Sequence, residues 1–394
     1  MRPPIPLQEA AHQAGVAPAT LRRWARSGLI PQYDGTWNGR AVAHARIVAR
    51  LRSRGHSLGA IRRASESGRL AYSFVEDLFP APAAGMTRDE AAAVTGLEPA
   101  LIERLYHAFG FPTTSLDHVT EDDLQLLRYI AAALAAGLPL VAFLQIARVY
   151  GQALAQIADA EVRLFHLYVH EPLMRDGVPG LAMAEEMEDL ARDLLPLASP
   201  MMDELHQRFL QHFVEQDVIG HMESDEENEQ LDLGRLRVAI AFVDLAGYTR
   251  LTEEEGEEAA VDLVERFVDA VEATLPDDAR VVKTIGDEAM IVGSDPTRLT
   301  HWALGFQMLM DERPLPRIGI HFGQTLYRDG DYYGREVNTA ARVVARAAGG
   351  EVLVTRAVVD AVSGDLEFEP IGEVRLKGFS VPTELFVAAT ADGA

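Results

Sequence analysis

The sequence predicts a multi-domain protein, with an all-α N-terminal half followed by an α/β half of the α+β, split-βαβ type. The chain has 394 residues, which is more than one hydrophobic core normally organises. Helical periodicity runs to about residue 220, and beyond residue 235 strands alternate with helices. The sequence contains no cysteine, so any metal must be held by carboxylates, imidazoles or carbonyl oxygens.

The net charge of −24 is unevenly distributed along the chain. Residues 1–80 contain twelve arginines, no lysine and five acidic residues, a charge of +7, so the other 314 residues carry −31. A basic segment on an acidic protein indicates a separate role for that segment, such as contact with phosphate groups. The N-terminus shows no apolar signal segment, and we expect a cytoplasmic protein.

An internal repeat relates two parts of the helical half. Each copy predicts a helix, a tight glycine turn, a second helix, a loop and two more helices. We therefore expect one domain at 1–80 and a second, helical domain at 86–220. The shared positions are Glu9, Ala10, Ala11, Gly15, Pro18, Ala19, Arg23 and Pro31 and, 81 residues later, Glu90, Ala91, Ala92, Gly96, Pro99, Ala100, Arg104 and Pro112.

Residues 129–147 form a run without formal charge that is nominally long enough to span a membrane. The sequence Gly137-Leu138-Pro139 divides it, which favours two buried helices joined by a turn over a membrane span. Further helices are expected at 185–195 and 202–213. An acidic stretch at 222–230 then predicts a linker at 221–235 and a last domain at 236–394.

The last domain should contain a ferredoxin-like split-βαβ sheet with one face covered by helices. The expected elements are a strand at 236–244, an amphipathic helix at 254–275, strands at 280–285 and 288–292, a helix at 297–310, a strand at 316–322, a loop, a helix at 337–348, a strand at 351–355 and a short C-terminal pair.

Two carboxylates in this domain suit metal-assisted phosphoryl chemistry. Asp244 ends the first strand, and Asp287 lies in the turn between the next two strands. Such rigid places can bring two oxygen ligands to divalent ions. The small residues Ala246 and Gly247 leave backbone amides free to approach phosphate, and the helix that follows them offers its N-terminus. Each motif alone is equally an ordinary strand-end cap or a Gly-Asp turn.

A third motif favours the functional interpretation of the two aspartates over the purely structural one. Asn338 and Arg342 lie four positions apart, on one face of a predicted helix. An asparagine can hold a ribose oxygen, and an arginine can reach the charge that builds on a pentavalent phosphorus. With these motifs in this order, residues 236–390 resemble the catalytic domain of class III adenylate cyclases.

The resemblance implies a role for each motif residue. It implies two Mg²⁺ or Mn²⁺ ions on Asp244, Asp287 and the carbonyl of Leu245. It implies adenine recognition by Lys283 and Asp331, ribose orientation by Asn338 and transition-state stabilisation by Arg342. Phosphate binding would fall to Ala246, Gly247, Tyr248 and Lys377, with Arg317 if its side chain points inward.

The implied reaction is in-line attack of the ATP 3′-hydroxyl on the α-phosphorus, which releases pyrophosphate. In this family the metal-binding aspartates come from one subunit. The other subunit supplies the base-reading pair together with the asparagine and the arginine. Because this chain carries the residues of both subunits' contributions, we expect a homodimer with two shared sites. Guanylate cyclase is disfavoured by Lys283 and Asp331, and a transcription regulator with a nucleotide-sensing domain remains an alternative.

Residues 5–70 resemble the winged helix-turn-helix of MerR-type regulators. Arg22, Arg23 and Arg26 would lie on the recognition helix and Arg40 in the wing, which suits DNA contact. Such modules also serve as packing units, and both interpretations stay open. The second copy has Glu103 and His107 at the positions of Arg22 and Arg26, so DNA binding is not expected there.

The second copy and its following helices resemble the regulatory region of actinobacterial class III cyclases. This resemblance implies a lipid or small apolar ligand, although an ordinary helical core explains residues 129–147 equally well. Ten of the twelve histidines precede residue 236, which raises the hypothesis of pH sensing. Those near the linker are His166, His170, His206, His212 and His221.

Overall fold

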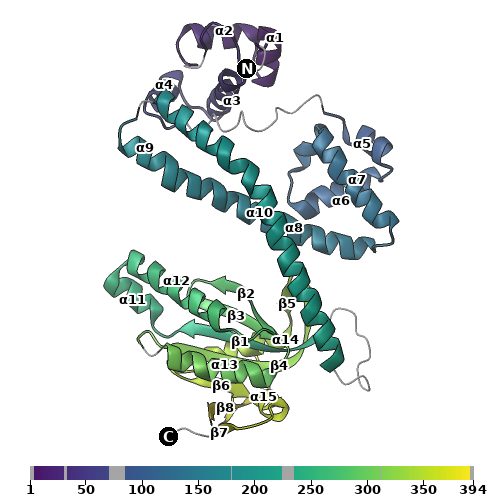
Figure 1. The fold of residues 1–394 in the computed structure, drawn as a ribbon, viewed down its shortest axis with the longest axis vertical. Coiled ribbons are helices and arrows are strands. Elements are labelled where there is room, and N and C mark those ends of the chain that lie inside the picture. The colour runs from purple at the N-terminus through teal and green to yellow at the C-terminus, as the bar shows by residue number, and fades with distance from the viewer. Residues whose placement is uncertain are drawn as a thin grey trace. The chain divides into compact units, whose positions relative to one another are not determined.

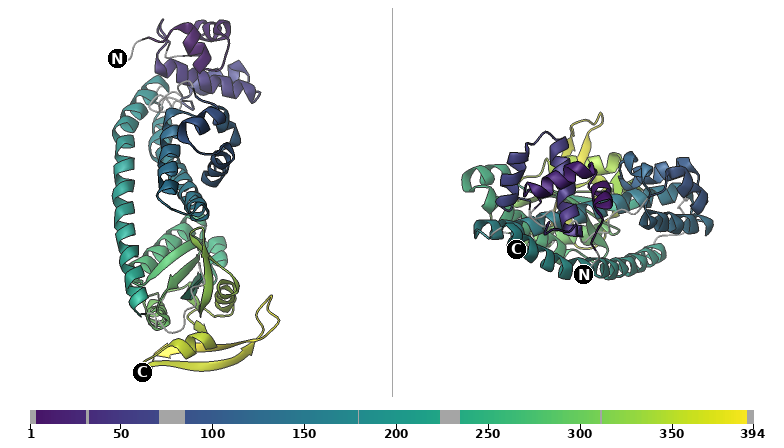
Figure 2. Two further views of the ribbon diagram at one scale, coloured as in Figure 1. Left: turned by 90° about the vertical axis from the view of Figure 1, so that its right-hand side faces the viewer. Right: turned by 90° about the horizontal axis from the view of Figure 1, so that it is seen from above.

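The computed structural model describes residues 4–30, 33–70, 85–178, 180–223, 235–310 and 312–390. The chain forms two compact units, Met1–Leu210 and Gln211–Ala394. The first is helical, and the second contains a mixed sheet with helices, which confirms the predicted fold class (Figures 1 and 2). Most of the predicted linker at 221–235 lies outside the described residues.

The first module begins at a short β-bridge between Ile5 and Trp37. Gly15, with φ of 66°, makes the turn between its first two helices, a conformation that favours glycine. Leu21 and Trp24 anchor the second helix in the core. The helices are α1 (Leu7–Gln13), α2 (Pro18–Arg26), α3 (Gly39–Ser53) and α4 (Leu58–Glu66).

Arg40 does not lie in a wing. The side chain of Asn38 accepts a hydrogen bond from the backbone N–H of Ala41, which caps α3. Because a cap of this kind satisfies an otherwise unpaired helix amide, the helix begins at Gly39 and includes Arg40. The expected position of Arg40 was therefore wrong.

The second module repeats this order. A bridge between Met86 and Val119 replaces the first bridge, and Gly96, with φ of 74°, makes the equivalent turn. Capping boxes at Thr87 and Thr120 start two of its helices. The elements are α5 (Arg88–Thr95), α6 (Pro99–Phe109), the 3₁₀ helix η2 (Thr113–Asp117), α7 (Glu121–Ala135) and α8 (Leu140–Phe165).

The apolar run at 129–147 is divided where the sequence indicated, because α7 ends at Ala135 and α8 begins at Leu140. Ile130 and Leu144 join the hydrophobic core of the second module. Among the described residues, Leu140–Arg175 is the one helical stretch long and apolar enough to cross a membrane, at a mean hydropathy of 1.2. A single stretch of this kind is weak evidence for a span.

The helical unit continues through a π-helical turn, η3 (His166–His170), then α9 (Glu171–Arg175) and α10 (Gly180–Glu223). The helices expected at 185–195 and 202–213 are joined in α10, which contains Pro196 and Pro200. The helix continues through both prolines, although the residues around them are mostly exposed.

Two of the histidines are in contact with each other. Nδ1 of His170 lies 3.0 Å from Nδ1 of His166, and Nε2 of His170 lies 3.0 Å from the carbonyl oxygen of Gly68. His206 and His212 are exposed, and the side chain of His221 lies outside the described residues. The pH-sensing hypothesis stays a prediction.

The sheet of the second unit has eight strands in the order β2-β3-β1-β4-β6-β8-β7, with β5 paired to β4. β4 and β6 run parallel, and the other described pairs are antiparallel. The strands are β1 (Arg235–Leu245), β2 (Ala279–Ile285), β3 (Glu288–Gly293), β4 (Pro316–Arg328), β5 (Asp331–Tyr333), β6 (Val352–Thr355), β7 (Leu366–Val374) and β8 (Thr383–Thr390).

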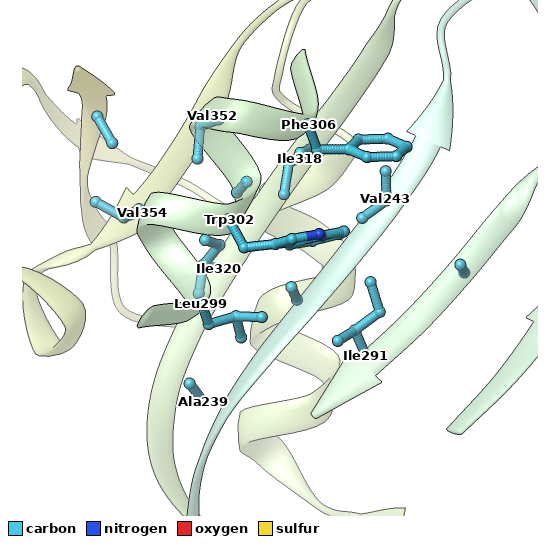
Figure 3. Close-up of a cluster of buried hydrophobic side chains, with 14 of the residues drawn as sticks. Ala239, Val243, Ile291, Leu299, Trp302, Phe306, Ile318, Ile320, Val352 and Val354 are labelled. Carbon is cyan, nitrogen blue, oxygen red and sulfur yellow. The ribbon is translucent and has the colours of Figure 1, made fainter. Parts of the chain in front are cut away.

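Helices cover parts of both faces of this sheet, whereas the sequence predicted one covered face. On one face, alternate residues of β1 such as Val243 pack with Trp302 and Phe306, as Figure 3 shows. On the other face, the intervening residues of β1, including Phe242, pack against Val344. The helices are α11 (Tyr248–Glu255), α12 (Glu257–Thr274), α13 (Pro296–Leu309), α14 (Arg335–Val344) and α15 (Arg356–Ala361).

The helix expected at 254–275 is α12, which begins three residues later because Gly256, with φ of 94°, separates it from α11. One further expectation was wrong. The loop expected after Phe322 is instead the outer half of β4, which turns back and pairs with β5 from Leu326 to Arg328. Most residues of that hairpin are exposed, so the sequence shows no alternation of hydrophobic and polar residues that would indicate a strand.

Gly319 allows α14 to approach β4 closely. A Cβ atom at this position would lie 2.2 Å from the backbone nitrogen of Val344. We expect Gly319→Ala to lower the free energy of unfolding by about 3 kcal/mol, the upper range for overpacking. Urea denaturation measures this loss.

Gly305 in α13 provides the matched control, because a Cβ atom there meets nothing within 4 Å. Gly305→Ala should raise the free energy of unfolding by about 0.5–1 kcal/mol, as alanine favours a helix interior. Equal effects of the two substitutions would show that the close packing of α14 on β4 is not as described.

Candidate active site

Asp244 lies near the end of β1, opposite Glu288 of β3 on one side and Arg317 of β4 on the other. It is only 8% exposed. The Arg317 guanidinium donates to Oδ2 of Asp244 from Nε at 2.6 Å, and its second nitrogen contacts the same oxygen. Arg317 therefore points inward and neutralises the carboxylate.

Asp287 lies in the turn between β2 and β3, near Asp244. Burial raises the pKa of Asp287 to about 6, and the negative charge of Asp244 contributes to the rise. Burial also raises the pKa of Glu288, with contributions from both aspartates, while Arg342 opposes the rise. Negative charge thus accumulates at this end of the sheet.

The two aspartates fit a divalent cation. Within the described parts of the chain, no group of three or more His, Cys, Asp or Glu residues is arranged to hold a metal. Asp244, Asp287 and the carbonyl of Leu245 nevertheless offer the hard oxygen donors that Mg²⁺ and Mn²⁺ prefer. Burial is the main cause of the raised pKa of Asp287, the charge of Asp244 adds to it, and a bound cation would favour the ionised carboxylate.

This pKa leads to a pH prediction. A cation at Asp287 would bind the carboxylate form, and with a pKa of about 6 this form is lost as the pH falls through 6. We expect Mn²⁺ affinity to fall by up to about tenfold per pH unit below 6, measured by calorimetry from pH 7.5 to 5. Asp287→Asn should bind Mn²⁺ more weakly and with a flatter pH profile. Unchanged wild-type affinity over this range would contradict the prediction.

The residues expected to bind phosphate lie in two loops. The backbone N–H of Ala246 donates to the carbonyl oxygen of Leu315 at 3.0 Å, so the expectation of a free amide there was wrong. Gly247, with φ of 94°, precedes α11, and Tyr248 is the first residue of that helix. Lys377 is exposed between β7 and β8.

Lys283 and Asp331 form an ion pair between Nζ and Oδ2, although they are 48 positions apart. Lys283 lies on β2 and Asp331 begins β5. The second carboxylate oxygen of Asp331 accepts a hydrogen bond from the backbone N–H of Tyr332 at 2.8 Å. The two residues that the resemblance pairs on adenine are therefore neighbours in one chain.

Asn338 and Arg342 are both exposed, one turn apart on α14. The first turn of this helix is fixed to the sheet by a contact between Glu336 Oε2 and Nε2 of His321 on β4. Nδ1 of His321 lies 2.8 Å from Oγ1 of Thr355, and burial lowers the pKa of His321. Sequence reasoning missed this support, because the contact depends on the packing of α14 over Gly323.

In the first module, Arg22, Arg23 and Arg26 are exposed on α2. Their helix is amphipathic, with Leu21 and Trp24 buried on the opposite side. The structure thus presents these three arginines to solvent, whereas Arg40 is partly buried on α3.

Three family models match the chain. The adenylate cyclase regulatory domain matches residues 28–214, the adenylate and guanylate cyclase catalytic domain matches 235–388, and the MerR family regulatory protein matches 7–42.

Similar proteins are found among bacterial cyclases. An adenylate cyclase of Streptomyces coelicolor is 31% identical over 69% of this chain and 70% of its own length. An adenylate cyclase of Streptomyces griseus is 32% identical over 67% of this chain and 65% of its own length. The alignments thus span about two-thirds of each relative. The crystal structure of the adenylyl cyclase CyaB from P. aeruginosa covers 39% of this chain and 94% of its own, at 22% identity and a TM-score of 0.37.

Proposed function

This chain belongs to the family of class III adenylate cyclases, and we propose from this premise that it converts ATP into 3′,5′-cyclic AMP and pyrophosphate. The observation that supports the proposal most is the ion pair of Lys283 and Asp331, which joins the two base-reading residues implied by the resemblance. Asp244 and Asp287 meet at the end of the same sheet. The residues for base selection and those for phosphate chemistry are then both present in the sequence of one domain.

One group of residues would bind the metal ions. Asp244, Asp287 and the Leu245 carbonyl would hold two Mg²⁺ or Mn²⁺ ions, which supply Lewis acidity toward the ribose 3′-hydroxyl and the triphosphate. Arg317 is already drawn to Asp244 and could turn toward phosphate oxygens once a cation neutralises that carboxylate.

The remaining groups read or stabilise the substrate. The Lys283 ammonium would donate to N1 of adenine, and the Asp331 carboxylate would accept from the exocyclic amine. Asn338 would orient the ribose, and Arg342 would stabilise the charge on the pentavalent phosphorus. The loops with Ala246, Gly247, Tyr248 and Lys377 would bind the phosphates, although the Ala246 amide is already paired.

We propose a homodimer with two shared sites. The metal-binding aspartates and the exposed pair Asn338 and Arg342 are all present in this chain. If each site takes its aspartates from one subunit and its α14 residues from the other, a two-fold dimer completes two sites. A monomer would then be inactive.

Exchange of the base-reading pair tests the function. In the double variant Lys283→Glu/Asp331→Ser, the groups that match N1 and the amine of adenine are gone, and a glutamate suits the guanine edge. With Mn²⁺, cyclic AMP formation should fall at least about a hundredfold and cyclic GMP formation should rise. The exposed pair Arg250 and Glu254 on α11 provides the control, because Arg250→Glu/Glu254→Ser should leave selectivity unchanged. Retention of ATP preference by the first variant would refute the assignment.

The exposed arginines of α2 favour a second, separate activity. We propose that Arg22, Arg23 and Arg26 allow the first module to contact DNA phosphates, with Arg40 on α3 at the edge of this surface. A gel shift on genomic fragments should be lost in Arg22→Ala/Arg23→Ala and kept in Arg63→Ala on α4. If the two variants bind equally well, α2 packs within the module and does not contact DNA.

We also propose that residues 86–220 regulate the cyclase domain at 236–394. The match to a regulatory domain over residues 28–214, which also covers much of the first module, supports a regulatory role for the chain ahead of the cyclase domain. Ile130 and Leu144 are part of a hydrophobic core, whereas Tyr129, Val141 and Ile146 are exposed, so a lipid or small apolar ligand would have to bind on this exposed part of the helices. Adding phospholipid vesicles to the full-length enzyme should change its rate if such a ligand acts, and an unchanged rate would argue against a lipid.

A further inference from the structure

A second contact joins β2 to β5 beside Lys283 and Asp331. Arg280, three residues before Lys283, donates from its guanidinium to the hydroxyl of Tyr332 at 3.3 Å. Its guanidinium carbon also lies 5.7 Å from the centre of the Tyr332 ring and 5.9 Å from that of Tyr327. Consecutive residues of β5, Asp331 and Tyr332, are therefore each held by a cationic side chain of β2.

A β-bulge makes this double contact possible. Arg280 pairs with Val292 and Lys283 with Met290, and the register shifts between Val281 and Lys283. Val292 and Met290 both belong to the core under α14, so their partners face the same side of the sheet. In a regular strand, residues three apart face opposite sides. The bulge thus brings both cations to one face, a use of bulges that is common beside active sites.

Tyr332 is a rigid anchor for its neighbour. It is 6% exposed, and its ring lies 5.1 Å from that of Tyr327, its cross-strand partner. Its backbone N–H is the group that holds the second oxygen of Asp331. A displacement of Tyr332 would therefore displace the Asp331 carboxylate as well.

We propose that Arg280 and Tyr332 are positioning residues for base selection. Their contact holds β5 against β2 in the register where Lys283 and Asp331 can both face one purine. This inference rests on the proposed function, in which Lys283 and Asp331 read adenine. Neither Arg280 nor Tyr332 needs to touch the base.

The test uses two variants of the full-length protein, Tyr332→Phe and Arg280→Met, with ATP and GTP as alternative substrates. Each removes the hydrogen bond while keeping a side chain of similar size. Each should lower kcat/KM for ATP about fivefold, mainly through KM, the scale of one lost hydrogen bond. Turnover of GTP should be unchanged, so that discrimination falls by the same factor.

A double-mutant cycle separates positioning from a general structural effect. In a Lys283→Met background the pair to be positioned no longer exists, so adding Tyr332→Phe should not change discrimination further. Arg237→Met is the matched control: the Arg237 guanidinium lies 4.9 Å from the Phe322 ring, on the face of the sheet opposite α14. This control should leave discrimination unchanged.

Three results would overturn the proposal. Equal losses for ATP and GTP in Tyr332→Phe and Arg280→Met would show that the contact serves only the fold. An additive loss of discrimination in the Lys283→Met background would show that it acts independently of the pair. Discrimination that survives Lys283→Met alone would instead show that the base-reading assignment itself is wrong.

Discussion

Asp244→Ala should lower kcat for cyclic AMP formation at least about a thousandfold, the scale that follows removal of a group stabilising transition-state charge. Asp244 is the buried carboxylate on which Arg317 and Asp287 converge, and its oxygens would bind the metal ions at the end of β1. Initial rates at saturating Mn²⁺ and ATP measure the loss.

The control must separate lost chemistry from lost folding. Asp278 is matched to Asp244: its side chain is 9% exposed, against 11% for Asp244, and it forms an ion pair with Arg298 at 3.1 Å. Asp278→Ala should destabilise the protein to a similar degree yet retain most of its turnover number. If both variants lose activity in proportion to their stability, the catalytic role of Asp244 is contradicted.

The second large effect is recovery of activity when the inactive variants Asp244→Ala and Arg342→Ala are combined in one dimer. Arg342→Ala should lose about a thousandfold or more in kcat, as expected for an arginine that stabilises a phosphoryl transition state. If Asp244 and Arg342 act in the same site from different subunits, a mixed dimer has one intact site. Random mixing should therefore restore about one quarter of the wild-type rate.

The outcome depends on exchange of subunits, so the two variants should be unfolded and refolded together. The Asp244→Ala and Arg342→Ala variants, refolded separately and mixed afterwards, provide the background rate. Activity in the co-refolded sample no higher than this background would show that each chain completes its own site, or that the dimer is assembled differently.

Much of the sheet could be predicted because its central strands are buried on both sides. The strand expected at 236–244 is β1 at Arg235–Leu245, and those expected at 280–285 and 288–292 are β2 and β3. The buried strands β1 and β3 give continuous apolar runs that identify them without knowledge of their partners. The edge strand β2 is only partly buried, and the Gly-Asp turn after it marked its end. The Gly286-Asp287 turn and the spacing of Asn338 and Arg342 are local features of the same kind.

What could not be predicted depends on contacts between distant segments. Arg317 meets Asp244 from 73 positions away, a contact set by the register of β1 and β4. The bulge before Lys283 leaves no mark in residue type, since Val281 and Val282 suit a regular strand as well. The amide of Ala246 was expected to be free because its partner, the Leu315 carbonyl, lies on a loop far along the chain.

The most direct test of the account is the product that the wild-type protein makes from an equimolar mixture of ATP and GTP with Mn²⁺, resolved by chromatography. The account predicts 3′,5′-cyclic AMP and pyrophosphate, with cyclic AMP exceeding cyclic GMP by about tenfold or more, because Lys283 and Asp331 match only adenine. Cyclic GMP as the main product, or no cyclic nucleotide at all, would contradict it.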